Sequence, residues 1–199
     1  MACSLLNMVP FSHGKGKEAM TGVFICPVDD ESAAFGPALE IGCALGTVLP
    51  FINDAGEAEV LKNLYPGGHC HVWGVRDEGE NRPVWEGMAP DDLLLGYRNG
   101  AILTASTVLY RTRNPALADR LWGGTPERPF ELMGFTGRPH VGEVPIVLQM
   151  LGYLDPDYRG FTRLGPEKCR AILNAFGSLE MFVRLGLRYD FPFNFRHSE

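Results

Sequence analysis

The sequence LLLGYRNGAILTASTVLY, residues 93–110, contains the clearest signal for a fold in this chain. Two apolar runs flank Asn99-Gly100, a dipeptide that readily adopts the positive φ angles of a two-residue hairpin turn. In the second run every other residue from Ile102 to Tyr110 falls on one face, which is the period of a β-strand. We therefore predict a β-hairpin over residues 93–110.

Shorter signals on both sides of this hairpin complete an α+β pattern. Apolar runs rich in β-branched and aromatic residues predict further strands at residues 23–28, 70–75 and 129–135. Helical segments are predicted after the capping residue Asp54, over residues 81–88, from Asn114 to Trp122, from Pro145 to Leu151, and from Gly165 onward with a break at Gly177-Ser178. This order of elements predicts a small, curved, mixed sheet covered by helices.

The composition is that of one folded globular domain. Hydrophobic residues make up 45% and charged residues 21% of the 199 residues, which are ordinary globular values. Residues 1–20 show no sustained periodicity, so we expect an irregular N-terminal arm followed by a single domain over residues 21–199. No apolar run approaches the length of a membrane span, and the N-terminus lacks the pattern of a secretion signal. We therefore expect a cytoplasmic protein without a membrane partner.

Charge is distributed unevenly along the chain. The net charge of -6 argues against indiscriminate nucleic-acid binding. However, residues 1–97 hold five basic and fourteen acidic side chains, whereas residues 98–170 hold ten basic and seven acidic ones. A polyanion would therefore meet the middle segment. The candidate phosphate-binding residues there are Arg98, Arg111, Arg113 and Arg120, which a solvated surface would explain equally well.

Motifs of known catalytic sites are missing from the sequence. It contains neither a GxSxG elbow for a nucleophilic serine nor a GxxxxGK[ST] phosphate loop. The only tight group of metal-type ligands is His69-Cys70-His71, which reads more readily as the entry of a strand than as a zinc site. The five cysteines form no CxxC pair, so reduced thiols are expected. We predict no catalytic residue, metal or cofactor on this chain.

Several short motifs, in their order and spacing, resemble one protein superfamily. They are VWGVR (72–76), WEGMAPDDLLLGYRNG (85–100), NPALADRLWG (114–123) and GFTRL (160–164), with a weaker echo in VFICPVDD (23–30). Together they resemble the EVE and YTH branch of the PUA-like superfamily, and specifically the modified-base-reading domains of McrB-type restriction systems. The resemblance covers about residues 69–176. It implies a curved sheet or partial barrel with a pocket for one nucleotide base swung out of its strand.

The resemblance also implies residues for this pocket. Trp73 matches the first wall of an aromatic cage and Trp122 the second, while Tyr97 is one candidate for a third wall, beside Phe130 and Phe135. The base edge would be read by Asp29 or Asp30 and by the main chain near Trp73 and Gly74. Stacking on aromatic rings returns roughly 1–3 kcal/mol per base, which can offset the loss of base stacking in the duplex.

Three functions follow as hypotheses. The first is a binding module that recognises a modified base, methylated in the first instance, in DNA rather than RNA, in a restriction or defence setting and with a separate nuclease or motor subunit as a possible partner. The second is an ASCH-like hydrolase of modified nucleosides, which would have to use Asp29 or Glu131. The third is a non-catalytic interaction protein whose tryptophans belong to the core, since a strand Trp such as Trp73 is by frequency more often a core residue than a ligand platform.

Overall fold

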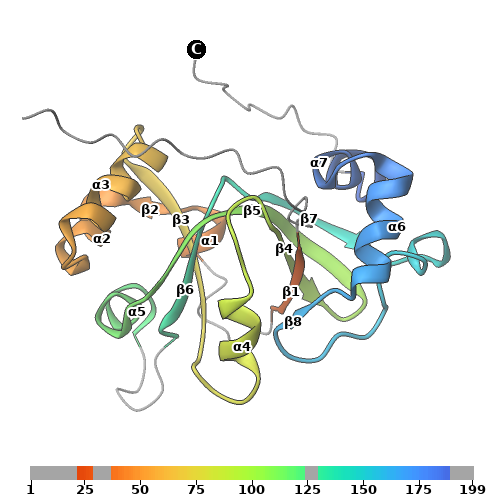
Figure 1. Ribbon diagram of the computed structural model, residues 1–199, viewed down its shortest axis with the longest axis horizontal. Coiled ribbons are helices and arrows are strands. Elements are labelled where there is room, and N and C mark those ends of the chain that lie inside the picture. Colours follow the sequence, from red (N-terminus) through yellow and green to blue (C-terminus); the bar gives the residue numbers. More distant parts are fainter. Residues whose placement is uncertain (1–21, 29–36, 124–129, 189–199) are drawn as a thin grey trace, which may run out of the picture.

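The computed structural model describes residues 22–28, 37–123 and 130–188. At its centre is a mixed eight-stranded sheet in the order β2-β3-β6-β5-β4-β1-β8, with β7 paired to β5 (Figure 1). The strands are β1 (Val23–Pro27), β2 (Cys43–Ala44), β3 (His69–Val75), β4 (Leu93–Arg98), β5 (Ala101–Arg113), β6 (Leu132–Thr136), β7 (His140–Pro145) and β8 (Thr162–Arg163). The α+β class and the mixed, unclosed sheet are as predicted, although the eight strands make the sheet larger than the small one expected.

Helices and single turns fill the connections between these strands. The α-helices are α1 (Pro37–Glu40), α2 (Leu45–Val48), α3 (Ala55–Leu64), α4 (Asn81–Glu86), α5 (Pro115–Trp122), α6 (Pro166–Phe176) and α7 (Leu179–Met181). The 3-10 turns η2 (Leu49–Phe51) and η3 (Leu148–Met150) and the π-helical turn η4 (Phe182–Gly186) complete the set. None of the helices in the described part of the chain is long and apolar enough to cross a membrane.

The predicted hairpin is confirmed as β4 and β5. Leu93 to Arg98 pair antiparallel with Thr107 to Ala101, and Asn99 and Gly100 adopt φ angles of 49° and 81° in the turn. β5 continues beyond the predicted end at Tyr110 to Arg113, because its carboxyl half pairs with β6 while its amino half pairs with β4 and β7. The hairpin is therefore the structural centre of the sheet.

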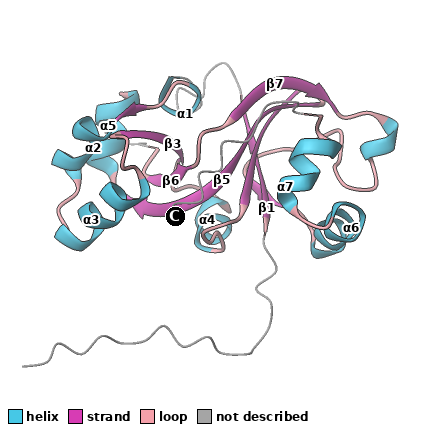
Figure 2. Cartoon of the chain, turned by 90° about the horizontal axis from the view of Figure 1, so that it is seen from above, coloured by secondary structure: helices cyan, strands magenta, loops and turns pink. Residues whose placement is uncertain are grey.

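Three apolar clusters separate the sheet from its helices. The first lies between β1, β4 and β5 and the helices α6, α7 and η4, and the third lies between β3 and β6 and the helices α2, α3 and α5. The second holds Trp73, Trp85 and Phe161 on the opposite face of β3 and β6 from the third cluster. Figure 2 shows α2, α3 and α5 gathered at one end of the sheet and α6 and α7 at the other.

Helix boundaries follow the predicted capping chemistry. The Asp54 carboxylate accepts a hydrogen bond from the Glu57 backbone N–H at 2.8 Å, and Asn114 Oδ1 accepts one from Leu117 N–H at 2.9 Å. Gly177, with φ at 79°, ends α6, and Ser178 caps α7. A side-chain acceptor at the N-cap replaces the missing intrahelical partner of one backbone donor. These starts and stops are therefore local properties of the sequence.

One predicted helix is wrong. Residues 145–151 form the end of β7 and the single turn η3 instead of an apolar helix opened by Pro145. Pro145 is the last residue of β7, which pairs with β5 from His140 to Pro145. Pairing with the central strand therefore overrides the helix-start signal. The predicted arm, residues 1–20, lies outside the described residues, as do Asp29 and Asp30.

The β3–β6 pair is built around a close approach between an indole ring and a glycine. Trp73 lies directly opposite Gly134 in the register, and a Cβ atom added to Gly134 would stand 2.8 Å from Trp73 Cε3. Trp73 is fully buried, so its ring has no free space into which it could move. Glycine at position 134 is therefore required by the volume of Trp73.

We expect Gly134→Ala to lower the free energy of unfolding by about 1–3 kcal/mol, because the new methyl group overlaps the fixed indole ring. Urea denaturation monitored by circular dichroism measures this change. Gly46→Ala is the matched control, since a Cβ at Gly46 in α2 meets no atom within 4 Å. Equal stability of the two variants would contradict the packing described for Trp73.

Candidate nucleic-acid interface

Trp73, the predicted first wall of a base pocket, is a core residue. Its side chain has 0% of its surface exposed. The indole N–H donates to Cys26 Sγ at 3.1 Å, and the ring lies 5.0 Å from the Phe161 ring, measured between centroids. Both the apolar and the polar parts of the side chain are thus engaged within the protein. Trp73 has no face open to a ligand.

Trp122, the predicted second wall, lies on the other face of β3. It ends α5, is half-buried, and packs on Gly74, where an added Cβ would stand 2.8 Å from Trp122 Cη2. Successive side chains of a strand point to opposite faces, so Trp73 and Gly74 belong to different faces. The structure therefore brings Trp122 to Gly74 and separates it from Trp73. The cage predicted from the two tryptophans is wrong.

Tyr97, the third aromatic residue of the predicted pocket, lies in a different cluster from both tryptophans. Tyr97 is 6% exposed and belongs to the cluster under α6 and α7. Its hydroxyl donates to the Pro156 carbonyl at 2.6 Å and accepts from Gly100 N–H at 2.9 Å, so it holds the hairpin turn. The three predicted aromatic residues thus lie in three different core clusters. Asp29 and Asp30 lie outside the described residues.

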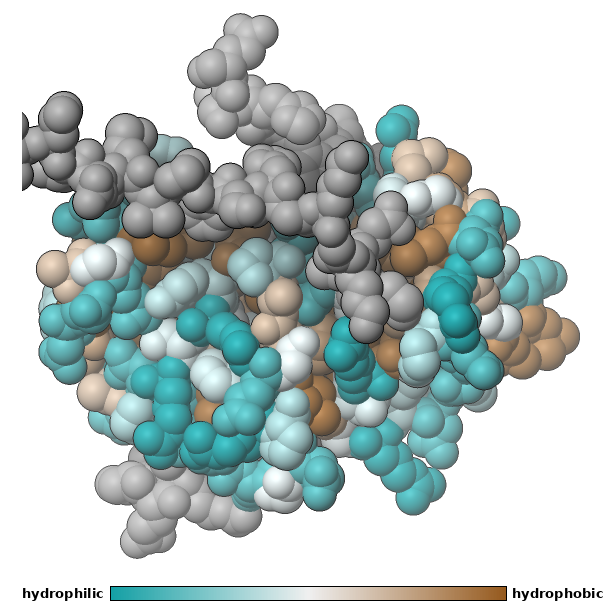
Figure 3. Space-filling model, in the orientation of Figure 1, coloured by the Kyte–Doolittle hydropathy of each residue, from teal (hydrophilic) through white to brown (hydrophobic). Residues whose placement is uncertain are grey.

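Arginines collect at one end of the sheet. β3 and β5 both pair antiparallel with β6, so their carboxyl ends meet at the edge where β6 begins. This edge carries Arg111 and Arg113 from β5, with Arg76 just after β3 and Arg82 in α4. We call these four residues the arginine edge. Figure 1 places α4 and α5 at this end of the sheet, and Figure 3 shows hydrophilic side chains gathered there.

Two members of the arginine edge are compensated by carboxylates. Arg82 donates through Nε to Asp77 at 2.9 Å, and Arg113 Nη2 lies 3.0 Å from Glu131 Oε2. Asp77 also lies 3.9 Å from Arg113, so it links the two. Ion pairs of this half-exposed kind contribute little stability, commonly below about 1 kcal/mol. Their guanidinium groups remain near the surface, although part of their charge is cancelled.

The other two members have no carboxylate partner among the described residues. Arg111 lies over the Trp85 ring, with Cζ 4.9 Å from the ring centroid, and donates to the Trp85 carbonyl at 2.7 Å. Trp85 is itself fixed, because its N–H donates to the Met133 carbonyl at 3.0 Å. Arg76 lies over the Phe130 ring at 4.6 Å. Both cations are therefore positioned by aromatic rings, and no carboxylate of the described residues offsets their charge.

The predicted phosphate-binding residues do not form one group. Arg98 lies beside the hairpin turn, opposite Ala101, whereas Arg111 lies near the other end of β5. Ten residues of extended chain between Ala101 and Arg111 span roughly 30 Å. Arg120 is exposed in the last turn of α5, the helix that ends at Trp122. Arg111, Arg113 and Arg120 thus belong to the same end of the molecule, and Arg98 does not.

Sequence reasoning missed Arg76 at this end, whereas it had named Phe130 as a candidate third wall of the cage. Arg76 follows β3 on the same face as Gly74, and the Phe130 ring contacts both Arg76 and the Trp122 ring, the latter at 6.1 Å in a T-shaped arrangement. Strand periodicity alone gives the shared face of Gly74 and Arg76. The same periodicity would have linked Arg76 to Trp122 if the face on which Trp122 lies had been known.

The histidines and Glu131 have structural partners. His71 Nδ1 donates to the Leu39 carbonyl at 2.7 Å, and His69 Nε2 donates to the Ile41 carbonyl at 3.0 Å, so both imidazoles tie β3 to the segment around α1. Burial lowers the pKa of His71 below its usual value. Glu131, considered for hydrolysis, is 8% exposed and pairs with Arg113. Within the described ranges, no group of three or more metal-type ligands converges.

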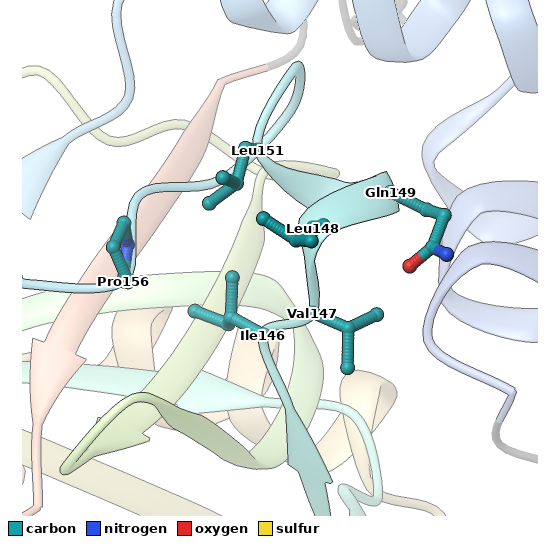
Figure 4. Close-up of a pocket in the computed structure, with 6 residues that line it drawn as sticks. All are labelled: Ile146, Val147, Leu148, Gln149, Leu151 and Pro156. Atoms are coloured by element: carbon teal, nitrogen blue, oxygen red, sulfur yellow. The ribbon is translucent and has the colours of Figure 1, made fainter.

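An apolar pocket is formed by a different part of the sequence, between residues 146 and 156. It has a volume of about 540 Å³ and is lined by Ile146, Val147, Leu148, Gln149, Leu151 and Pro156 (Figure 4). Leu148 is 81% exposed and Val147 49% exposed. The pocket is shallow and open, and none of the predicted base-binding residues lines it. It therefore does not supply the enclosed aromatic site that a flipped base requires.

Comparison with known proteins identifies a structural relative. The sequence matches no protein-family model and no curated protein. Among solved structures, the chain is similar to the N-terminal domain of McrB from Thermococcus gammatolerans, which was determined bound to m5C DNA. The TM-score is 0.55 at 11% sequence identity, and the match covers 79% of this chain and 98% of that one. The chain therefore has the fold of a McrB N-terminal domain.

Because Trp73 fills the core, we expect Trp73→Ala to lower the free energy of unfolding by about 3–5 kcal/mol. Chemical denaturation measures this loss. Tyr158→Ala offers a comparison, since this half-buried ring should cost less. A Trp73→Ala protein with unchanged stability would show that Trp73 is a ligand-facing side chain after all.

Proposed function

We propose that this chain is a DNA-binding module that recognises a modified base. The observation that carries the proposal is the fold shared with a McrB domain bound to m5C DNA, over nearly the whole of that domain. Cytosine methylated at carbon 5 is accordingly the first modification to test. The proposal is one of binding without catalysis, in keeping with this relative.

The arginine edge is the surface that we propose for the DNA backbone. Phosphate contacts position a protein on its duplex, and guanidinium groups match phosphate oxygens with paired N–H donors. Arg76 and Arg111 of this edge have no carboxylate partner among the described residues and should contribute more than Arg82 and Arg113. The overall charge of -6 makes a local cationic surface necessary, because the average field of the protein repels DNA.

The base itself would meet aromatic residues other than Trp73. Trp122 and Phe130 are half-buried at the arginine edge, on the face of β3 opposite to Trp73. Aromatic rings beside cations favour a base that has left its stack. We therefore retain Trp122 and Gly74 from the predicted pocket, and replace Trp73 with Phe130.

A restriction or defence role is the broader proposal. The chain would then act with a separate nuclease or motor subunit.

The exposed side chains Val147 and Leu148 favour a protein-interaction role in addition to DNA binding, because contiguous exposed apolar surface commonly marks interaction sites. Association of the wild-type protein with itself or with such a subunit, measured by light scattering before and after Leu148→Asp, tests that additional role.

We expect the protein to bind a duplex oligonucleotide containing 5-methylcytosine more tightly than the same duplex without the methyl group. Fluorescence anisotropy with methylated, hydroxymethylated and plain duplexes measures the preference. Equal affinity for all three would contradict recognition of a modified base, and no binding to any of them would contradict DNA binding altogether.

We also expect Arg111→Gln to reduce the slope of log Kd against log salt by about 0.9, the value for one lost phosphate contact on duplex DNA. The same measurement on Arg170→Gln is the control, because Arg170 is exposed on α6 near the other end of the sheet. If both substitutions change the slope equally, the DNA backbone does not lie on the arginine edge.

A further inference from the structure

The three tryptophans of this chain differ in the bonding of their indole N–H groups. Trp73 donates to Cys26 Sγ and Trp85 donates to the Met133 carbonyl. The Trp122 N–H is buried and has no hydrogen-bond partner among the described residues. Buried donors in folded proteins nearly always find an acceptor, because an unpaired one retains the cost of its lost hydration. Trp122 therefore needs an explanation that the other two do not.

A second unpaired donor lies beside it. Arg76 Nε is also buried and finds no hydrogen-bond partner within the part of the chain that the structure describes. Arg76 and Trp122 both contact the ring of Phe130, from distances of 4.6 Å and 6.1 Å to its centroid. Two unpaired N–H groups are thus attached to neighbouring side chains at one end of β3. The other buried polar atoms without a partner in the described chain are Glu57 Oε1, Ser106 Oγ and Thr136 Oγ1, which belong to α3, β5 and β6.

Glycine at position 74 makes this neighbourhood possible. A Cβ there would lie 2.6 Å from the Phe130 carbonyl oxygen and 2.8 Å from the Trp122 ring. Any larger residue would displace the backbone of Phe130 or push Trp122 away from β3. The sequence therefore holds Trp122 and Phe130 close against the end of β3, with both donors left unpaired.

The missing partner must be an acceptor, and the charge of Arg76 indicates its kind. No carboxylate of the described residues pairs with Arg76, so an anionic oxygen would gain both a hydrogen bond and a charge interaction. Because both N–H groups are buried in the free protein, we propose that Arg76 and Trp122 turn outward and bind phosphodiester oxygens of the DNA strand that occupies the arginine edge. This site rests on the proposed function and names two donors for the same ligand.

A neutral indole N–H gives this site a property that arginines alone lack. Its contact with a phosphate adds a hydrogen bond without releasing a further counterion, so it strengthens binding without steepening the salt dependence. Arg76 adds a hydrogen bond and also releases a counterion. The two side chains should therefore be distinguishable by salt titration, even though they serve one strand.

The test replaces each donor with the smallest possible change of shape. Trp122 is replaced by 3-benzothienylalanine, in which sulfur takes the place of the indole N–H, and Arg76→Lys keeps the charge but removes Nε–H. Binding to a methylated duplex and to the same plain duplex is measured across a range of salt concentrations. The control is 3-benzothienylalanine at Trp73, where the N–H has a partner inside the core.

We expect the Trp122 replacement to weaken binding to both duplexes by roughly tenfold to a hundredfold, the equivalent of one hydrogen bond to a charged acceptor, with an unchanged salt slope. Its Tm should stay the same or rise, because no internal bond is lost. Arg76→Lys should weaken binding to both duplexes at an unchanged slope, and Arg76→Gln should also lower the slope by about 0.9. The Trp73 control should lose Tm and keep its DNA affinity.

Several outcomes would overturn the site. Wild-type affinity in both the Trp122 and Arg76→Lys proteins, while the wild type binds DNA, would show that the donors do not meet the ligand. A loss confined to the methylated duplex would assign the donors to the base in place of the phosphates. If the wild type binds no DNA at all, the proposed function fails first, which is a separate result.

Discussion

The fold depends on two indole rings that lie on opposite faces of the same pair of strands, each against a glycine. Trp73 packs over Gly134 on one face, and Trp122 packs over Gly74 on the other. Gly74 follows Trp73 directly in β3, and successive residues of a strand point to opposite faces. The position of Trp73 on one face of β3 therefore fixes the position of Gly74 on the other face. A shift of one residue in the β3–β6 register would place an indole against a side chain on both faces at once. The register and the two clusters therefore determine each other.

This constraint explains why the two tryptophans have different chemistry. Trp73 is enclosed by strands and α1 and finds an acceptor in Cys26, so the core includes all of it. Trp122 ends a short helix at the border of its cluster and contacts the strand through the far edge of its six-membered ring. Its N–H is consequently held at the end of the sheet, beside Arg76 and Phe130.

Local signals in the sequence predicted the hairpin at Asn99-Gly100 and the helix caps at Asp54 and Asn114, because each depends on the backbone preferences of a few adjacent residues. Residues 145–151 were predicted wrongly, since pairing with β5 is not visible from Pro145 itself. The cage failed for a similar reason: matching Trp73 and Trp122 to motifs ignored the face on which each would lie. Alternation within VWGVR would have placed Gly74 and Arg76 together and Trp73 apart, but only the contact between the Trp122 ring and Gly74 in the structure shows that Trp122 joins them.

The unpaired donors indicate how stability and binding are divided in this protein. A buried N–H without an acceptor costs free energy in the free protein, commonly about 1–3 kcal/mol. The indoles of Trp73 and Trp85 have acceptors inside the core. The Trp122 N–H and Arg76 Nε have none among the described residues, and they lie together at the edge where β3 and β5 end and β6 begins. In the proposed complex an anionic strand supplies the acceptors that the two N–H groups lack in the free protein. Binding then recovers the free energy that the unpaired donors cost, because the anion competes with no internal partner for these hydrogen bonds.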